Sequence, residues 1–235
     1  MFKGIKQIFS ARNKDVRNKI LFTLLILFIY KIGTSIRVPG TEDITSDLGF
    51  LELLNVMSGG SLRNFSIFAL GVTPYISASI IVQLLQMDII PYFSNLAKEG
   101  HSGRVKLNKI TRYLGIALAF LQGLVMSFSF LGEGATSMEY LTTTIILTAG
   151  TCFLLWLGDQ ITRKGVGNGI SIIIMAGILI STPSMMVDAF GSFVVGETTQ
   201  EIALGVTKFI LFVLVYIAII VGVVFIEKSE RRLPV

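Results

Sequence analysis

Long apolar runs separated by clusters of charge dominate the pattern of this 235-residue chain. A helix needs about 20 mostly apolar residues to cross the hydrocarbon core of a bilayer. The runs that meet this length, allowing for an isolated lysine near one end, are 20–36, 65–87, 113–132, 140–158, 169–187 and 202–226. Lys31 and Lys208 are these two lysines, and each can extend its ammonium to the headgroups. The runs lack the alternation of barrel strands, so the pattern predicts an all-α integral membrane protein, a multi-spanning helical bundle.

Composition supports the same environment. Charged residues make up 15% of the chain and apolar residues 52%, whereas about 25% of the residues of a soluble domain are charged. The low charge and its confinement to the connections argue against buried helices of a soluble protein.

Basic residues gather in 1–19, 88–112, 159–164 and 227–235, while the other connections hold most of the acids. Because lysine and arginine accumulate on the cytoplasmic side of membranes, we expect both termini of this chain in the cytoplasm. The pI near 9.4 then reflects topology and requires no nucleic-acid partner. The basic residues expected to face a cytoplasmic partner or anionic lipid are Arg104, Lys106, Lys109, Arg112, Arg231 and Arg232.

Two segments are apolar without being spans. Residues 1–17 fit a short amphipathic helix at the membrane interface and equally well a disordered basic leader. Residues 48–57 are too short to span, and Ser58-Gly59-Gly60 follows them as a break. Pattern alone favours a helix lying on the membrane surface over a re-entrant helix between the spans.

The second predicted span carries Gly71, Pro74, Ser77 and Gln83. Proline is expected to kink this helix, and the polar residues indicate a side that faces other helices or an aqueous path. Ordinary interhelical hydrogen bonds and a pore-lining role explain them equally well.

The sequence around Gly165, Gly167 and Gly169 lacks the lysine and hydroxyl positions of a phosphate-binding loop. It predicts a tight turn between two spans, with Asn168 capping the fifth helix.

Several of these stretches, taken together, resemble the SecY family. SGGSLRNFSIFALGVTPYISASIIVQLLQ (58–86) resembles its second transmembrane region, and WLGDQITRKGVGNGISIII (156–174) resembles its fourth and fifth helices. KIGTSIRVPG (31–40) and KEGHSGRVKLNKITRY (98–113) match the same family in the same order. Arg37 departs from the family, which usually has proline before Val-Pro-Gly.

The resemblance implies a half channel: five helices of the first inverted repeat plus the first helix of the second, in a family built of ten. The implied divisions are a basic amino-terminal segment 1–19, the first half 20–187 with a plug segment at 47–63, an external hinge loop 188–201, the sixth span 202–226 and the start of a cytoplasmic loop 227–235. We therefore expect a fragment or truncated form.

The resemblance also implies a ring of aliphatic side chains that closes the pore. Its members here are Val72, Ile76, Ile170 and Ile174. The spacing agrees independently, since residues four apart share one face of a helix. From the residues alone, lipid-facing or core aliphatics remain an alternative.

The resemblance assigns two further sets of residues. The plug, which would fill the outer funnel at rest, consists of Leu48, Phe50, Leu51, Leu54, Met57, Ser58, Gly59 and Gly60. The lateral gate, through which signal sequences reach lipid, includes Ser77 and Gln83.

The implied function is that of the central subunit of the Sec protein-conducting channel, which secretes unfolded preproteins and inserts membrane proteins at the bacterial plasma membrane. The implied partners are SecE, SecG, the SecA ATPase or a translating ribosome, preprotein signal sequences and anionic lipids, with no catalysis, cofactor or metal. A solute transporter would need ionisable residues inside the membrane, and only Lys31 and Lys208 are candidates. An intramembrane enzyme would need acidic residues or histidine at membrane depth, and the predicted spans hold neither.

Overall fold

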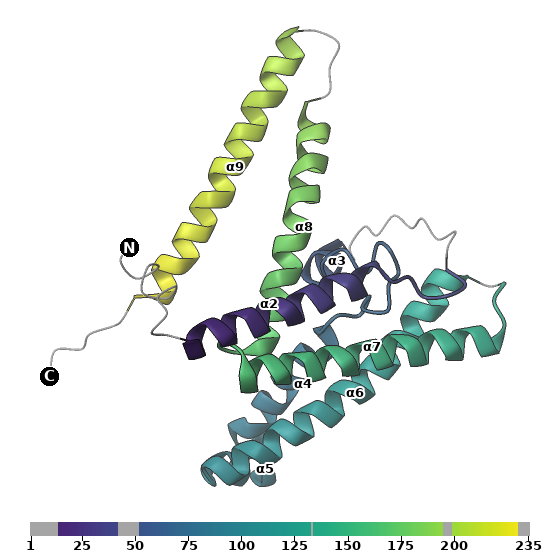
Figure 1. Ribbon diagram of the computed structural model, residues 1–235, viewed down its shortest axis with the longest axis vertical. Coiled ribbons are helices and arrows are strands. Elements are labelled where there is room, and N and C mark those ends of the chain that lie inside the picture. Colours follow the sequence, from purple (N-terminus) through teal and green to yellow (C-terminus); the bar gives the residue numbers. More distant parts are fainter. Residues whose placement is uncertain (1–13, 42–51, 133, 195–198, 230–235) are drawn as a thin grey trace, which may run out of the picture. The chain divides into compact units, whose positions relative to one another are not determined.

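The computed structural model describes residues 14–41, 52–132, 134–194 and 199–229 of the chain. These residues are mainly helical and belong to two compact units, Met1–Ser181 and Thr182–Val235, which we describe separately. The elements, shown in Figure 1, are α2 (Lys14–Ser35), α3 (Glu52–Met57), α4 (Thr73–Leu84), the π-helical turn η2 (Leu85–Ile89), α5 (Pro91–Lys98), α6 (His101–Leu131), α7 (Ser137–Lys164), α8 (Gly169–Phe193) and α9 (Thr199–Glu227).

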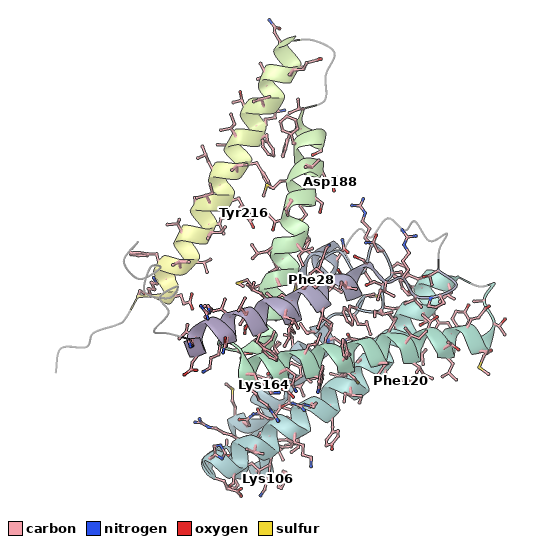
Figure 2. All side chains as sticks on the ribbon, viewed as in Figure 1. Phe28, Lys106, Phe120, Lys164, Asp188 and Tyr216 are labelled. Atoms are coloured by element: carbon pink, nitrogen blue, oxygen red, sulfur yellow. The ribbon has the colours of Figure 1, made fainter. Side chains whose placement is uncertain are left out.

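Among the described residues, four helices, α6 to α9, are long and apolar enough to cross a membrane, and the bent pair formed by α4 and α5 makes a fifth candidate if it counts as one span. The helix over the first predicted span, α2, has 22 residues and includes Lys19 and Lys31, and it is not among these. Apolar side chains cover much of the outer surface, with Phe28 and Phe120 among those exposed (Figure 2). An exposed apolar surface of this extent fits contact with lipid.

The second predicted span differs most from expectation. Its helix, α4, begins at Thr73 instead of 65, because residues 58–72 form consecutive turns. Pro74 therefore lies in the first helical turn, where a missing N–H costs no hydrogen bond, and it starts the helix instead of kinking it. The bend comes later, where η2 leads into α5 at an angle of 93°.

The loops predicted at 88–112 and 159–164 are largely helical. The first contains α5 and the opening turns of α6, and the second is the end of α7. Likewise α8 continues to Phe193, past the predicted limit at 187 and through Pro183. Apolar runs mark where a helix is in lipid, and helices can continue into water, so hydropathy underestimated their length.

The core of the first unit is a close packing of α6 against α7, with α4 lying against α6 (Figure 1). Every fourth residue of α6 is buried, and most of them are small: Gly103, Leu107, Thr111, Gly115, Ala119, Gly123 and Ser127. Small residues let helix backbones approach each other, which is the usual basis of packing between membrane helices.

Two groups of contacts define opposite ends of this unit. At one end, the amide of Val166 donates to the Thr23 hydroxyl over 3.2 Å, and Arg112 pairs with Asp159. At the other end, Arg37 and Ser66 form an isolated antiparallel bridge, supported by the bond from the Val38 amide to the Phe65 carbonyl (3.0 Å). Basic residues from three of the predicted cytoplasmic segments lie at the first end: Lys19 is one turn before Thr23, Arg163 and Lys164 come just before Val166, and Arg112 makes the ion pair.

The second unit contains the last part of α8 and all of α9. Their contact is aromatic, with Phe190 edge-on to Phe209 and Phe193 tilted against Phe212. Gly205 allows α9 to approach the carbonyl of Phe193 closely.

Candidate functional site

The four predicted ring residues lie around one apolar cluster, which α2, α7, α8 and the segment before α4 build together. Val72 is a buried member of this cluster, at 4% exposure. Ile76, Ile170 and Ile174 are partly buried and pack against it. The structure thus places both pairs, which lie about a hundred residues apart in the sequence, in or against the same apolar cluster.

The position of Ile170 follows from how α8 begins. The Asn168 side-chain oxygen accepts hydrogen bonds from the amides of Ile170 (3.1 Å) and Ser171 (3.4 Å), which confirms the predicted cap. The Gly169 amide donates to the Thr162 hydroxyl over 2.8 Å, and Gly169 lies directly against the Gly158 carbonyl of α7. This contact fixes the first turn of α8, and Ile170 with it, against α7.

The position of Val72 follows from the start of α4. Val72 is the N-cap residue, and its carbonyl accepts bonds from the amides of Tyr75 and Ile76, both at 3.1 Å. The preceding Gly71 has a positive φ of 57°, which favours glycine. The chain therefore turns into α4 with Val72 buried and Ile76 one turn further along.

Along α8, the two isoleucines continue into a stripe formed by Ile170, Ile174, Gly177 and Ser181. Spacings of four, three and four residues put all of them on one helix face. The first two are large and partly buried, and the last two are small and buried. The segment around α3 packs against these small residues, because the Ser181 hydroxyl lies 3.0 Å from the Val56 carbonyl oxygen.

The plug segment predicted from the resemblance is described from residue 52 onward. Of its predicted members, Leu54, Met57, Ser58, Gly59 and Gly60 lie in this part, and Leu48, Phe50 and Leu51 lie outside the described residues. Leu54 packs against the apolar cluster that contains Leu62 and Phe65. The short helix therefore lies against the core of the first unit.

The turn after α3 is organised by Asn55, which is 4% exposed. Its carbonyl accepts a bond from the Gly60 amide (2.9 Å), and its side-chain oxygen accepts one from the Arg63 amide (2.9 Å). Gly59 and Gly60 have φ values of 71° and 80°, in the left-handed region that glycine tolerates best. The break predicted at Ser58-Gly59-Gly60 is thus a defined turn.

The two predicted gate residues do not come together. The Gln83 amide donates to the Ser79 hydroxyl over 3.2 Å, and both line a polar cavity of about 250 Å³ between α4 and α6. Ser77 is half-buried and is not part of that lining. Six residues of helix correspond to a rotation of about 120° between Ser77 and Gln83, so they occupy different faces.

A second cavity, of about 310 Å³, lies beside α3 and was not predicted. Its walls are mostly apolar and come from α3, the segment before α4, the first residue of α4, and α6: Leu54, Leu62, Ala69, Leu70, Thr73, Leu121, Gln122, Val125 and Met126.

The basic residues predicted to face a partner or lipid divide into several groups. Arg112 pairs with Asp159 and joins α6 to α7, so its role is at least partly structural. The Lys106 ammonium lies 3.5 Å from the Glu99 carboxylate, and Lys106 is labelled in Figure 2. Arg104 lines the polar cavity, and Lys109 is exposed. Arg231 and Arg232 lie outside the described residues.

Sequence reasoning missed Tyr30, Asn55, Gly177 and Ser181. The last two could have been found, because they extend the spacing of Ile170 and Ile174 along the same face. Tyr30 and Asn55 gave no local signal, since their contacts depend on segments distant in the sequence.

Comparison with known proteins identifies the family of the chain. The profile of the SecY family matches residues 66–235. The protein translocase subunit SecY of Staphylococcus aureus is 48% identical over 95% of this chain and 54% of its own length, and that of Staphylococcus epidermidis is 45% identical over 100% and 56%. The chain thus spans about half the length of the curated relatives it matches.

Solved structures show the same fold. The Sec61 channel in a canine ribosome–channel complex from the endoplasmic reticulum has a TM-score of 0.69 at 19% identity, over 96% of this chain and 51% of that one. A second structure, of a protein-conducting channel, has a TM-score of 0.59 at 21% identity, over 77% and 40%. The matched profile and the identity to the staphylococcal proteins lead to one conclusion: this chain is a multi-spanning helical membrane protein that belongs to the SecY family.

Proposed function

We propose that the chain is the central subunit of a protein-conducting channel, through which unfolded preproteins cross the plasma membrane of a bacterium and membrane proteins enter it. One observation carries this proposal. Two pairs of aliphatic side chains, from α4 and its N-cap and from α8, lie in or against one apolar cluster, and a short helix contacts the same face of α8.

The physical basis is the behaviour of a narrow apolar ring. Such a ring excludes water and therefore resists ions, yet its side chains can move apart around a passing polypeptide. The segment around α3 would add a second barrier beside the ring. A related SecY structure, with a TM-score of 0.55 at 22% identity, is described as one in which the plug domain stabilises the closed state and maintains a membrane seal.

Orientation and partners follow from charge. The end of the first unit that carries the described basic residues would face the cytoplasm, which would put both termini of this chain there. Exposed Lys109, together with Arg104, would then contact anionic lipid, SecA or a translating ribosome. SecE and SecG would complete the membrane part, and the energy for movement would come from the cytoplasmic partner, with no catalysis by this chain.

The test is cross-linking to a preprotein arrested in the assembled translocase. Starting from Cys152→Ala, the ring variants Ile76→Cys and Ile170→Cys would be compared with Ile81→Cys and Leu179→Cys. These controls lie on the same two helices and are exposed, and each lies five residues, about 140° of rotation, from a ring residue. We expect cross-links from the ring positions only. Equal cross-linking at all four positions would show that these side chains line no conduit.

A further inference from the structure

Three segments meet where the turn after α3 reaches α8. A Cβ atom placed on Gly177 would lie 2.5 Å from the Met57 carbonyl oxygen and 3.2 Å from the Gly59 amide nitrogen. A Cβ on Gly59 would lie 3.2 Å from the Gly177 Cα and 3.1 Å from the hydroxyl of Tyr30 on α2. The backbones at Gly59 and Gly177 are therefore in direct contact, and the buried Tyr30 side chain of α2 packs beside both of them.

One turn further along α8, the Ser181 side chain makes the polar part of the same contact. Its hydroxyl lies 3.0 Å from the Val56 carbonyl oxygen and 2.9 Å from the Gly177 carbonyl oxygen, and the residue is 5% exposed. Val56 is in the last turn of α3, and its carbonyl also accepts a hydrogen bond from the Gly59 amide over 3.1 Å. A carbonyl oxygen has two lone pairs, so the Ser181 hydroxyl can make a second bond to it, and this second bond joins the end of α3 to α8.

We propose that Gly177 and Ser181 are positioning residues that form a latch on α8, which sets the resting position of residues 52–63, the described part of the plug segment, and how readily they leave. This rests on the proposed function, in which that segment blocks the channel. The latch combines two contacts. One is the close backbone contact at Gly177, which is possible only without a side chain there, and the other is the hydrogen bond from the Ser181 hydroxyl to the Val56 carbonyl. Such a contact holds the segment in register and yet can be broken without separating large apolar side chains.

The test measures the plug segment directly. In a Cys152→Ala background, Met57→Cys gives the chain a single thiol, at the end of α3. The rate at which a membrane-impermeant maleimide labels this thiol would be measured in membranes that contain the assembled translocase. Gly177→Ala forces the Met57 carbonyl away, and Ser181→Ala removes the hydroxyl. We expect each to raise the labelling rate, Ser181→Ala by about two- to tenfold, the range expected for one net hydrogen bond. Ser181→Thr keeps a hydroxyl and is expected to label more slowly than Ser181→Ala.

The chain offers matched controls on the same helix. Among the described residues, no atom lies within 4 Å of the Cβ that Gly191→Ala would add, and exposed Ser192 donates a local hydrogen bond to the Ala189 carbonyl over 2.8 Å. Unchanged labelling in both latch variants, or an equal rise in Gly191→Ala and Ser192→Ala, would overturn the latch. Because labelling needs no preprotein, its result is separate from that of the cross-linking test: a functional latch without ring cross-links would refute only the proposed function.

Discussion

Replacing Gly169 by alanine tests the contact that positions Ile170. Gly169 begins α8, and a Cβ there would overlap the Gly158 carbonyl group of α7 and lie 2.8 Å from the Ile161 Cβ. Backbone atoms cannot rotate out of the way, so the start of α8 must move away from α7. We expect this movement to stretch the 2.8 Å bond from the Gly169 amide to the Thr162 hydroxyl as well.

The expected magnitude is the balance of three effects. Overpacking of a close contact typically costs about 1–3 kcal/mol, and loss of the hydrogen bond adds about 1 kcal/mol. Alanine is favoured over glycine within a helix by at most about 1 kcal/mol, which offsets part of this cost. The free energy of unfolding should therefore fall by about 1–3 kcal/mol.

Gly191→Ala is the matched control. It lies in the same helix, and no atom of the described residues is within 4 Å of its Cβ position, so it should raise the free energy of unfolding by about 0.5–1 kcal/mol. Gly158→Ala should fall between the two, since its Cβ would lie 3.0 Å from Cγ1 of the Ile170 side chain, and a side-chain atom can shift where the backbone carbonyl that faces Gly169 cannot.

The measurement is unfolding of the purified protein in mixed micelles, followed by circular dichroism and by fluorescence of Trp156, the one tryptophan of the chain. Equal stability of Gly169→Ala and Gly191→Ala would refute the argument that a backbone contact between α7 and α8 sets the position of Ile170.

Two further predictions concern the contact of α6 with α7. Thr144→Val should lower the free energy of unfolding by about 1 kcal/mol, because Thr144 is fully buried and its hydroxyl lies 3.1 Å from that of Ser127. Thr142 is exposed, so the control Thr142→Val should change the free energy of unfolding little. Similar losses in the two variants would contradict this prediction. A double-mutant cycle with Arg112→Gln and Asp159→Asn should give a coupling energy below about 1 kcal/mol, because the two side chains are 45% and 25% exposed. Added salt should reduce this coupling energy. A larger coupling energy that does not depend on salt would show that the ion pair is desolvated, against this prediction.

Local patterns predicted the features that depend on neighbouring residues. The start of α8 and its Asn168 cap are examples, since a cap needs only a suitable side chain just before an apolar run. The start of α4 was wrong because hydropathy is the same for an apolar turn and an apolar helix. Residues 65–72 are mostly apolar and mostly buried, yet their backbone follows turns until the helix begins at Thr73, with Pro74 in its first turn.

The candidate site required contacts that no local pattern encodes. Ser181 and Val56 are separated by 125 residues, and the need for glycine at 177 becomes visible only when the Met57 carbonyl is in place. Spacing could show that Ile170, Ile174, Gly177 and Ser181 share a face. It could not show that the small half of this face contacts another segment.

The order of sizes along that face gives a physical reason for the arrangement. Two large residues followed by two small ones make α8 wide at Ile170 and Ile174 and narrow at Gly177 and Ser181. On the proposed function, the wide part constricts the channel and the narrow part makes room for the plug segment beside it. A large side chain at 177 would expel the plug, and a small one at 170 or 174 would widen the ring. The two barriers therefore depend on one helix face, and any movement of α8 relative to α4 and α3 would act on both of them together.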